Sequence, residues 1–275
     1  MFPQPSLLPA LDLVRRTIAA ETAYAVSRLQ VVERNSGNPF GVAFRAFGDG
    51  GMALMARRIP LPLFNSVKGM GPGDETQIAA IATWYRENGV NGQFELIPGL
   101  FDEALARELH KAGYFHSGFH VALVAESDAA APVLPPGVEI EPVGNPPLLD
   151  DFFDAYVAGW RFERGDRGAF KANVREWLGR PGWSLYLARV DGRPSAAATL
   201  FMHEKTGYCA DAATDPGFRG RGLHRALLAQ RIAAAAAAGA DFVCGGANFL
   251  SASHRNMERA GMRVQFVRAL WTKVS

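Results

Sequence analysis

Residues 213 to 228 read Ala213-Thr-Asp-Pro-Gly-Phe-Arg-Gly-Arg-Gly-Leu-His-Arg-Ala-Leu-Leu228, an arginine- and glycine-rich turn between an apolar strand-like run and a helical pattern. Gly220 and Gly222 lack a Cβ, so the backbone can turn with positive φ and bring its N–H groups close to a ligand. The following helix adds unpaired first-turn N–H groups and the positive end of its dipole. The turn therefore predicts an anion site, although an ordinary loop that caps a helix can contain the same residues.

Composition and charge limit the classes of partner. The chain has 275 residues, enough for one or two domains with an ample apolar core. Its 29 basic and 27 acidic residues leave it near neutral, which argues against binding to nucleic acid or to a membrane surface. A local basic turn can still hold one polyanionic cofactor.

Cysteine content and the start of the chain indicate the compartment. Cys209 and Cys244 both lie in apolar strand-like runs, which predicts buried, reduced thiols with neither a disulfide framework nor a metal cluster. The start of the chain lacks a basic segment followed by a continuous apolar one, and no run approaches about 18 uncharged apolar residues. We therefore expect a soluble, cytoplasmic protein without a bound metal.

The clearest boundary in the chain is a stretch rich in proline and alanine at residues 127–137, which predicts a linker. Beyond it, the hydrophobic patterns predict the order β-α-α-β-β-β-α-β-α-β. The strands are expected at 138–141, 184–190, 195–203, 208–214 and 241–245 and as a pair within 262–274, and the helices at 147–162, 169–178, 222–238 and 251–260.

This order resembles the GCN5-related N-acetyltransferase (GNAT) family, whose acetyl-CoA signature is Arg or Gln, two variable residues, Gly, one variable residue, then Gly or Ala. Here the signature reads Arg219-Gly-Arg-Gly-Leu-His224, with a histidine in place of the small last residue. A second family feature is the late helix followed by Gly and an apolar residue, Ser253-His-Arg-Asn-Met-Glu-Arg-Ala-Gly-Met262. The resemblance covers residues 137–275 and implies an α/β (α+β) fold, a mixed, mostly antiparallel sheet flanked by helices.

The first half of the chain looks like a second copy. Leu105-Ala-Arg-Glu-Leu-His-Lys-Ala-Gly-Tyr114 matches residues 253–262, and apolar segments follow both, at 119–124 and 266–271. The stretch also contains a hairpin-like pair, a helix and a strand, at 41–47 with 52–57, at 75–88 and at 93–97.

The loop of this first half differs from the signature. It reads Val67-Lys-Gly-Met-Gly-Pro-Gly-Asp74, in which Pro72 has no N–H to donate and Asp74 repels an anion. We therefore expect a degenerate GNAT-like domain at 1–126 that does not bind CoA, the linker at 127–137 and an acetyl-CoA-binding catalytic domain at 138–275.

The resemblance also implies the donor-binding residues. In the family, pantetheine lies along the exposed strand edge before the signature, and the phosphates meet backbone N–H groups of the turn. One of Arg219 and Arg221 could instead be a solvated surface charge, and Ser251 could simply cap the late helix. The expected acetyl-CoA-binding residues are Ala212, Ala213, Thr214, Arg219, Gly220, Arg221, Gly222, Leu223, His224, Asn248, Ser253 and Asn256.

The sequence indicates the general acid, the general base and the acceptor site less clearly than the donor site. Many relatives carry a tyrosine acid where this chain has Met257. Asp211, in a strand of Tyr, Cys and Ala, is the candidate general base, and strand alternation would place it on one face with Cys209 and Ala213. Alternatively it pairs with a nearby arginine. The candidate substrate residues are Trp160, Phe162 and Glu163, although aromatic residues at this spacing also occur in cores.

Together these features imply an N-acetyltransferase that transfers an acetyl group from acetyl-CoA to a primary amine of a small molecule or peptide by direct attack on the thioester. A non-catalytic acyl-CoA-binding or regulatory protein remains the alternative. We expect neither nucleic acid nor a membrane as partner, and the sequence leaves a monomer and a homodimer open.

Overall fold

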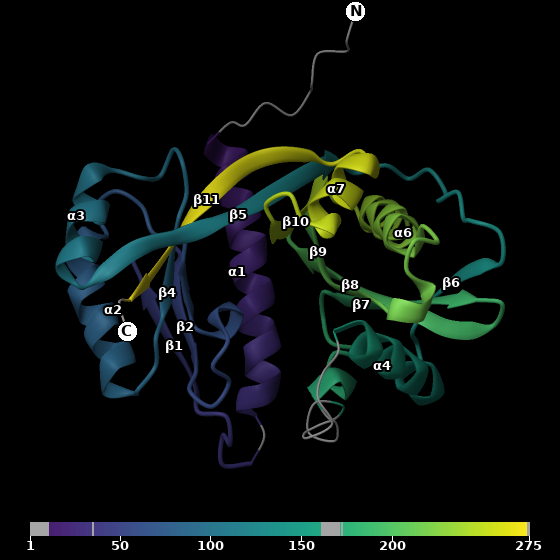
Figure 1. Ribbon diagram of the computed structural model, residues 1–275, viewed down its shortest axis with the longest axis horizontal. Helices are drawn as coiled ribbons and strands as arrows, with labels where there is room; N and C mark the ends of the chain where they lie inside the picture. Colours follow the sequence, from purple (N-terminus) through teal and green to yellow (C-terminus); the bar gives the residue numbers. More distant parts are fainter. Residues whose placement is uncertain (1–10, 35, 161–170, 172, 274–275) are drawn as a thin grey trace, which may run out of the picture. The chain divides into compact units, whose positions relative to one another are not determined.

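The computed structural model describes residues 11–34, 36–160, 171 and 173–273 (Figure 1). The described chain divides into two compact units. The C-terminal unit contains Leu123–Val264, and the N-terminal unit contains the residues up to Ala122 together with the segment from Gln265. This division differs from the expected domains 1–126 and 138–275, because strands β5 (Tyr114–Glu126) and β11 (Arg263–Lys273) each contribute residues to both units.

The N-terminal unit has helices on both faces of a mixed sheet (Figure 1). Its strand order is β1-β2-β3-β4-β11-β5. Strands β3 and β4 are parallel, whereas β1 with β2, β2 with β3, and β4 with β11 are antiparallel. Helix α1 lies against one face, and α2 and α3 lie against the other. The elements are α1 (Leu11–Glu33), β1 (Val42–Phe47), β2 (Gly51–Ala56), β3 (Ser66–Lys68), α2 (Glu75–Glu87), β4 (Gln93–Leu96) and α3 (Glu103–Lys111).

Two of these elements were missed by the sequence patterns. Helix α1 buries residues on several sides, among them the consecutive run from Ala20 to Thr22, which weakens the period of 3.6 that marks a helix. Strand β3 has only three residues, too few to show alternation.

The strands of the C-terminal unit also run in mixed directions, and helices cover both of their faces. Its strand order is β5-β10-β9-β8-β7-β6, antiparallel from β9 through β6, with β9 and β10 parallel. Helix α4 covers one face and α6 the other (Figure 1). The elements are β6 (Val138–Pro142), α4 (Pro146–Trp160), β7 (Trp183–Val190), β8 (Arg193–His203), β9 (Thr206–Thr214), α6 (Leu223–Ala237), β10 (Phe242–Asn248) and α7 (Ala252–Arg259).

The expected fold class, a mixed and mostly antiparallel sheet flanked by helices, is confirmed, and one element is corrected. The strand pair expected within 262–274 is the single long strand β11, because no turn interrupts the chain between Arg263 and Lys273. The helix expected at 169–178 falls partly outside the described residues, and within it residues 173–175 are helical. Cys209 and Cys244 are buried thiols, as the sequence predicts.

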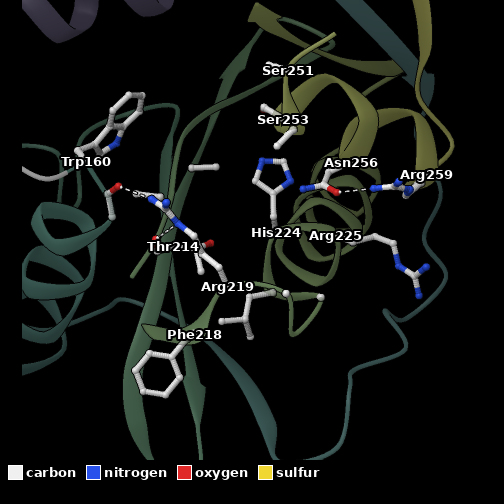
Figure 2. A pocket seen from close by; sticks show the side chains of 17 residues that line it. Trp160, Thr214, Phe218, Arg219, His224, Arg225, Ser251, Ser253, Asn256 and Arg259 are labelled. Carbon is white, nitrogen blue, oxygen red and sulfur yellow. Dashed lines mark hydrogen bonds between the residues drawn. The ribbon is translucent and has the colours of Figure 1, made fainter. Parts of the chain in front are cut away.

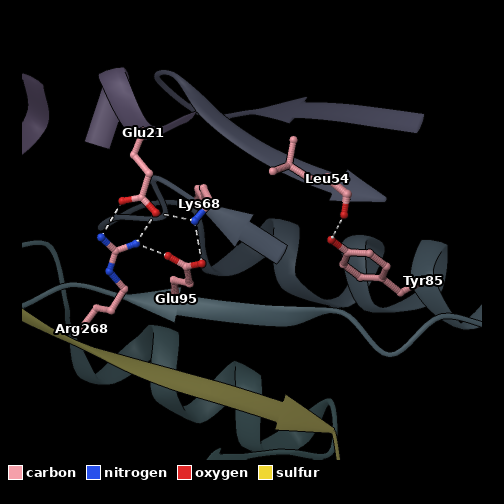
Figure 3. A network of polar contacts seen from close by, with 6 residues as sticks. All are labelled: Glu21, Leu54, Lys68, Tyr85, Glu95 and Arg268. Carbon is pink, nitrogen blue, oxygen red and sulfur yellow. Dashed lines mark hydrogen bonds and ion pairs between the residues drawn. The ribbon is translucent and has the colours of Figure 1, made fainter. Parts of the chain in front are cut away.

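A fully buried cluster of four charges joins the elements of the N-terminal unit (Figure 3). Lys68 Nζ on β3 lies 2.8 Å from Glu21 Oε1 on α1 and 2.7 Å from Glu95 Oε1 on β4. Arg268 on β11 binds Glu21 with two nitrogens, at 2.8 and 2.6 Å, and also contacts Glu95. Two cations and two anions therefore neutralise one another away from water.

The pKa values in this cluster reflect the pairing. Burial by itself would raise the pKa of Glu21 and of Glu95, but Arg268 and Lys68 more than offset this effect and lower both. Burial would lower the pKa of Lys68, yet the two carboxylates raise it. All four groups are thus charged at neutral pH, and the loss of any one leaves an uncompensated buried charge.

We expect Glu95→Gln to lower the free energy of unfolding by about 3–5 kcal/mol, the usual cost of breaking a buried ion pair by removing one partner. Urea denaturation followed by circular dichroism measures the change. Glu103→Gln is the matched control, since Glu103 and its partner Arg107 are exposed and such pairs contribute about 1 kcal/mol or less. Equal effects of the two substitutions would contradict a structural role for the cluster.

Candidate active site

The site begins where two parallel strands part. Strands β9 and β10 are paired only from Phe242↔Thr206 to Cys244↔Tyr208, although β9 continues to Thr214 and β10 to Asn248. Beyond the last pair, the edge of β9 that faces β10 has lost its strand partner. The end of β9 is where the resemblance placed pantetheine.

The glycine-rich turn connects β9 to α6. After a short 3₁₀ turn at Pro216–Phe218, Gly220 and Gly222 have φ of 80° and 78°, and Gly222 is the N-cap of α6. A side chain at Gly222 would be strained in this left-handed conformation, and its Cβ would lie 3.2 Å from Cγ of Pro135. The turn thus depends on glycine to direct the chain into the first turn of α6.

A cavity of about 840 Å³ opens between the end of β9, this turn and α7 (Figure 2). All of the expected donor-binding residues line it except Arg221 and Asn248. Trp160 also lines it, whereas Phe162 and Glu163 lie outside the described residues. The lining residues are Gly159, Trp160, Ala212, Ala213, Thr214, Phe218, Arg219, Gly220, Gly222, Leu223, His224, Arg225, Ser251, Ala252, Ser253, Asn256 and Arg259.

The sequence reasoning missed two cations of the cavity, Arg225 and Arg259. Arg259 lies three residues after Asn256 and therefore shares its helix face, so the helical period could have identified it. Arg225 directly follows the signature in the first turn of α6. Both cations add positive charge to the lining.

The two signature arginines have different places. Arg219 lines the cavity, and its guanidinium donates to the carbonyl oxygens of Thr214 at 3.4 Å and Gly159 at 3.2 Å, which joins the end of β9 to the last turn of α4. Arg221 is exposed and lies over the ring of Phe218, 5.6 Å from its centroid, outside the lining. The structure thus brings Arg219 to the cavity and places Arg221 on the surface.

His224 and Asn256 both line the cavity, and Figure 2 draws their side chains next to one another. Asn256 Oδ1 accepts a hydrogen bond from Arg259 Nη1 at 3.2 Å. Burial, together with the positive charge of Arg231, lowers the pKa of His224 to about 4. The imidazole is therefore neutral at physiological pH and adds a neutral polar group to a lining whose other titratable side chains, among the described residues, are arginines.

Asp211 lies in a β-bulge instead of a regular strand. Thr199 pairs with Ala210 and Ala197 with Ala213, so two residues of β9 stand opposite one residue of β8, and Asp211 has φ of 49°. The bulge interrupts the alternation from which a shared face with Cys209 and Ala213 was expected. The side chain does not line the cavity.

The carboxylate of Asp211 instead holds neighbouring elements. Tyr156 on α4 donates its hydroxyl to Oδ1 at 3.1 Å, and Thr199 on β8 donates to Oδ2 at 3.1 Å. On α6, the fully buried Arg231 donates to the carbonyl oxygens of Thr199 and Ala210, each at 3.1 Å. Burial lowers the pKa of Arg231, and the charge of Asp211 opposes this shift. These contacts fix the bulge directly before the cavity.

Two serines line the cavity from the α7 side, and a buried methionine lies beside them. Ser251 is the N-cap of α7 and accepts a hydrogen bond from the His254 N–H at 3.1 Å, while it also lines the cavity. Met257, at the position where many GNAT relatives carry a tyrosine, is buried. The Oγ of Ser253 lies 4.0 Å from the Met257 sulfur.

The comparisons with known proteins agree with this geometry. The family model described as an acetyltransferase (GNAT) domain matches residues 134–249. This stretch of the chain is therefore similar to a GNAT acetyltransferase domain. No curated protein matches its sequence.

Several solved structures share the fold. A GCN5-related N-acetyltransferase from Kribbella flavida has a TM-score of 0.64 at 17% identity and covers 93% of this chain and 96% of its own. A GCN5-related N-acetyltransferase from Sphaerobacter thermophilus has a TM-score of 0.61 at 16% identity, and the match covers 97% of this chain and 93% of that one. A tandem GNAT protein from the clavulanic acid biosynthesis pathway has a TM-score of 0.61 at 14% identity, and the match covers 97% of this chain and 96% of that one.

The described residues show no sign of a metal site or of a membrane-spanning helix. They contain no group of three or more His, Cys, Asp or Glu side chains that could hold a metal ion. Within the same described ranges, no helix has the length and apolar character needed to cross a membrane.

We expect the imidazole of His224 to titrate near pH 4, well below the ordinary value of about 6.5, because burial and Arg231 both disfavour the charged ring. Following the ring Cε1–H signal by NMR across pH 3.5–8 measures this directly, with the His224→Gln variant identifying the signal. A midpoint near 6.5 would show that the ring is hydrated and charged more readily than its surroundings imply.

Proposed function

We propose that the C-terminal unit transfers an acetyl group from acetyl-CoA to a primary amine of a small molecule or peptide, by direct attack of the amine on the thioester. The observation that carries the proposal is the cavity, because one hollow is lined by the unpaired end of β9, the glycine-rich turn, the start of α6 and one face of α7. These are the elements that the GNAT resemblance assigns to the acyl donor.

The charge and shape of the lining fit a polyanionic donor. Arg219, Arg225 and Arg259 supply positive charge, and the 15-residue helix α6 presents its first-turn N–H groups and positive dipole end at the turn. The described lining contains no carboxylate that would repel phosphate. In this proposal Ala212–Thr214 hold the pantetheine, and the bound donor supplies an activated acyl carbonyl.

The N-terminal unit is proposed to be a GNAT-like domain that no longer binds CoA. Both halves end a helix at a glycine of positive φ before a long strand, Gly113 after α3 and Gly261 after α7. In the loop at 67–74, however, the N–H of Gly71 donates to Asp74 Oδ2 at 3.0 Å, and the N–H of Gly73 donates to Glu75 Oε2 at 2.9 Å. Carboxylates of the chain itself thus occupy N–H groups that a phosphate would need.

The two units differ in the residues that directly follow the last residue pair of their parallel strands. In the N-terminal unit the β3–β4 pairing ends at Val67↔Phe94, and the next residues, Lys68 and Glu95, form a buried ion pair. In the C-terminal unit the next residue of β10 is Gly245, which has no side chain, and a Cβ there would lie 2.9 Å from Met257 Cε. The difference supports a donor slot in the C-terminal unit alone.

A non-catalytic acyl-CoA-binding role is the second candidate, and one observation favours it. An alkyl amine with a pKa of about 10.4 must lose a proton before it attacks, at a cost of about 4–5 kcal/mol at pH 7. Met257 offers no proton, and the carboxylate of Asp211 lies outside the lining with both oxygens hydrogen-bonded. Among the described lining residues, the only candidate for proton transfer is then His224.

We expect one equivalent of CoA to bind per chain in isothermal titration calorimetry, and Arg259→Ala to weaken binding about tenfold through the loss of one charge-assisted contact. Arg107→Ala, which removes an exposed arginine of the N-terminal unit, is the control. Thiol release from acetyl-CoA with a panel of primary amines then separates the two candidates, since binding without turnover favours the non-catalytic role. Two equivalents would contradict the degenerate N-terminal unit, and no binding would contradict both candidates.

For Asp211 we expect a positioning role. Asp211→Asn keeps an oxygen for one of the two hydroxyl donors, so kcat should fall by about tenfold or less, with an unchanged pH profile. Steady-state kinetics between pH 6 and 9.5 test this. A loss of roughly 10²–10⁴-fold together with disappearance of the ionisation on the acidic side of the profile would identify Asp211 as the general base.

A further inference from the structure

The connection from β10 to α7 contains a residue in a conformation that disfavours its side chain. Leu250 has φ of 59°, in the left-handed region, and its side chain is 62% exposed. Only glycine, asparagine and aspartate occupy this region readily, and a bulky residue there marks local strain. Because the side chain is largely in solvent, packing of Leu250 does not explain the turn.

A buried histidine holds this turn in place. The N–H of Leu250 donates to Nδ1 of His254 at 2.9 Å, and the His254 side chain is 3% exposed. An Nδ1 that accepts a hydrogen bond carries no proton, so in the neutral ring the proton is on Nε2, which lies 3.6 Å from Glu258 Oε1. The Phe249 ring packs against the imidazole, with 5.4 Å between centroids.

The same residues set the α7 wall of the cavity. The N–H of Ser251 donates to the carbonyl of Asn248 at 3.0 Å, and Ser251 Oγ caps the N–H of His254. Reciprocal hydrogen bonds therefore tie the turn to the first turn of α7. Ser251, the N-cap of α7, lines the cavity, and so does Asn256, which lies two residues after His254 and so on another face of the helix.

We propose that His254 is a positioning residue for the acyl donor: by accepting the Leu250 N–H, it maintains the strained turn that holds Ser251, Ser253 and Asn256 in the cavity wall. The role rests on the proposed binding of CoA in this cavity. His254 itself does not line the cavity, so its effect on the donor passes through the turn and α7.

Substitution of Leu250 tests the turn without disturbing the core. Leu250→Val adds β-branching at a left-handed position and should raise the Kd for CoA by about five- to tenfold, whereas Leu250→Gly should leave it within about twofold. Leu63→Val is the matched control, since Leu63 is 52% exposed and does not have a positive φ. Isothermal titration calorimetry with CoA measures all three.

Substitution of His254 tests the acceptor. His254→Phe keeps an aromatic ring but removes Nδ1, and we expect about a tenfold higher Kd for CoA, with the KM for acetyl-CoA raised and kcat little changed. His254→Asn retains an oxygen acceptor near Nδ1 and should bind CoA close to the wild-type level. The decisive variant combines His254→Phe with Leu250→Gly, because glycine adopts the turn without help and should restore CoA affinity.

A role of His254 in packing alone would leave the double variant as weak a binder as His254→Phe, and this result overturns the proposal. Unchanged CoA affinity in Leu250→Val also overturns it, and that variant remains informative if His254→Phe does not fold. Failure of the wild-type chain to bind CoA overturns the proposed function itself and this role with it. Binding by the wild type with no effect of the variants overturns only the role of His254.

Discussion

The separation of β9 and β10 after three residue pairs is the constraint on which the site of the C-terminal unit depends. Two parallel strands that pair and then diverge expose a strand edge, and the connection between them must be a crossover helix, here α6. The glycine-rich turn and the start of α6 therefore fall at the same end as the exposed edge. Residues 212–224 come together because the topology brings the end of one strand to the start of the next helix.

The N-terminal unit also has a parallel strand pair joined by a helix, but different side chains follow the pair. Its parallel strands β3 and β4 flank α2, and β4 also pairs with β11. Where the strands would part, Lys68, Glu95 and Arg268 form a neutral, dehydrated cluster with Glu21. Such a cluster is costly to open, because each charge stabilises the others in a medium of low polarity. The proposed donor slot in one unit and the ion-pair network in the other thus follow from the side chains placed at one step of a shared strand–helix–strand arrangement.

Local sequence patterns predicted most of the residues that line the cavity but not the conformation of Asp211, for physical reasons. Residues such as Arg219, Gly222 and Asn256 lie in short local patterns, a turn and a helix face, whose geometry follows from neighbours in the chain. The bulge at Asp211 arises from a mismatch between two strands, which alternation within one strand does not reveal. The division of β5 and β11 between the two units depends on contacts between distant parts of the chain. The buried charge cluster likewise joins α1 to β11, whose paired residues are 247 positions apart in the sequence.

In the proposed reaction, the charges of the cavity bear on how an acceptor amine would be selected. A wall of arginines favours the phosphates of a donor and repels a free ammonium group, so its own preference is for the donor. Bound phosphates neutralise these cations, which lowers the electrostatic penalty for an amine that arrives second. Selection among amines must then come from side chains other than the arginines. In the described part of the lining, the exposed indole of Trp160 is the largest side chain that could contact an amine. It follows Gly159, whose carbonyl accepts from the Arg219 guanidinium. Donor affinity and acceptor choice are thus set by different groups, so substitutions in the arginine-lined wall should alter the first and leave the second unchanged.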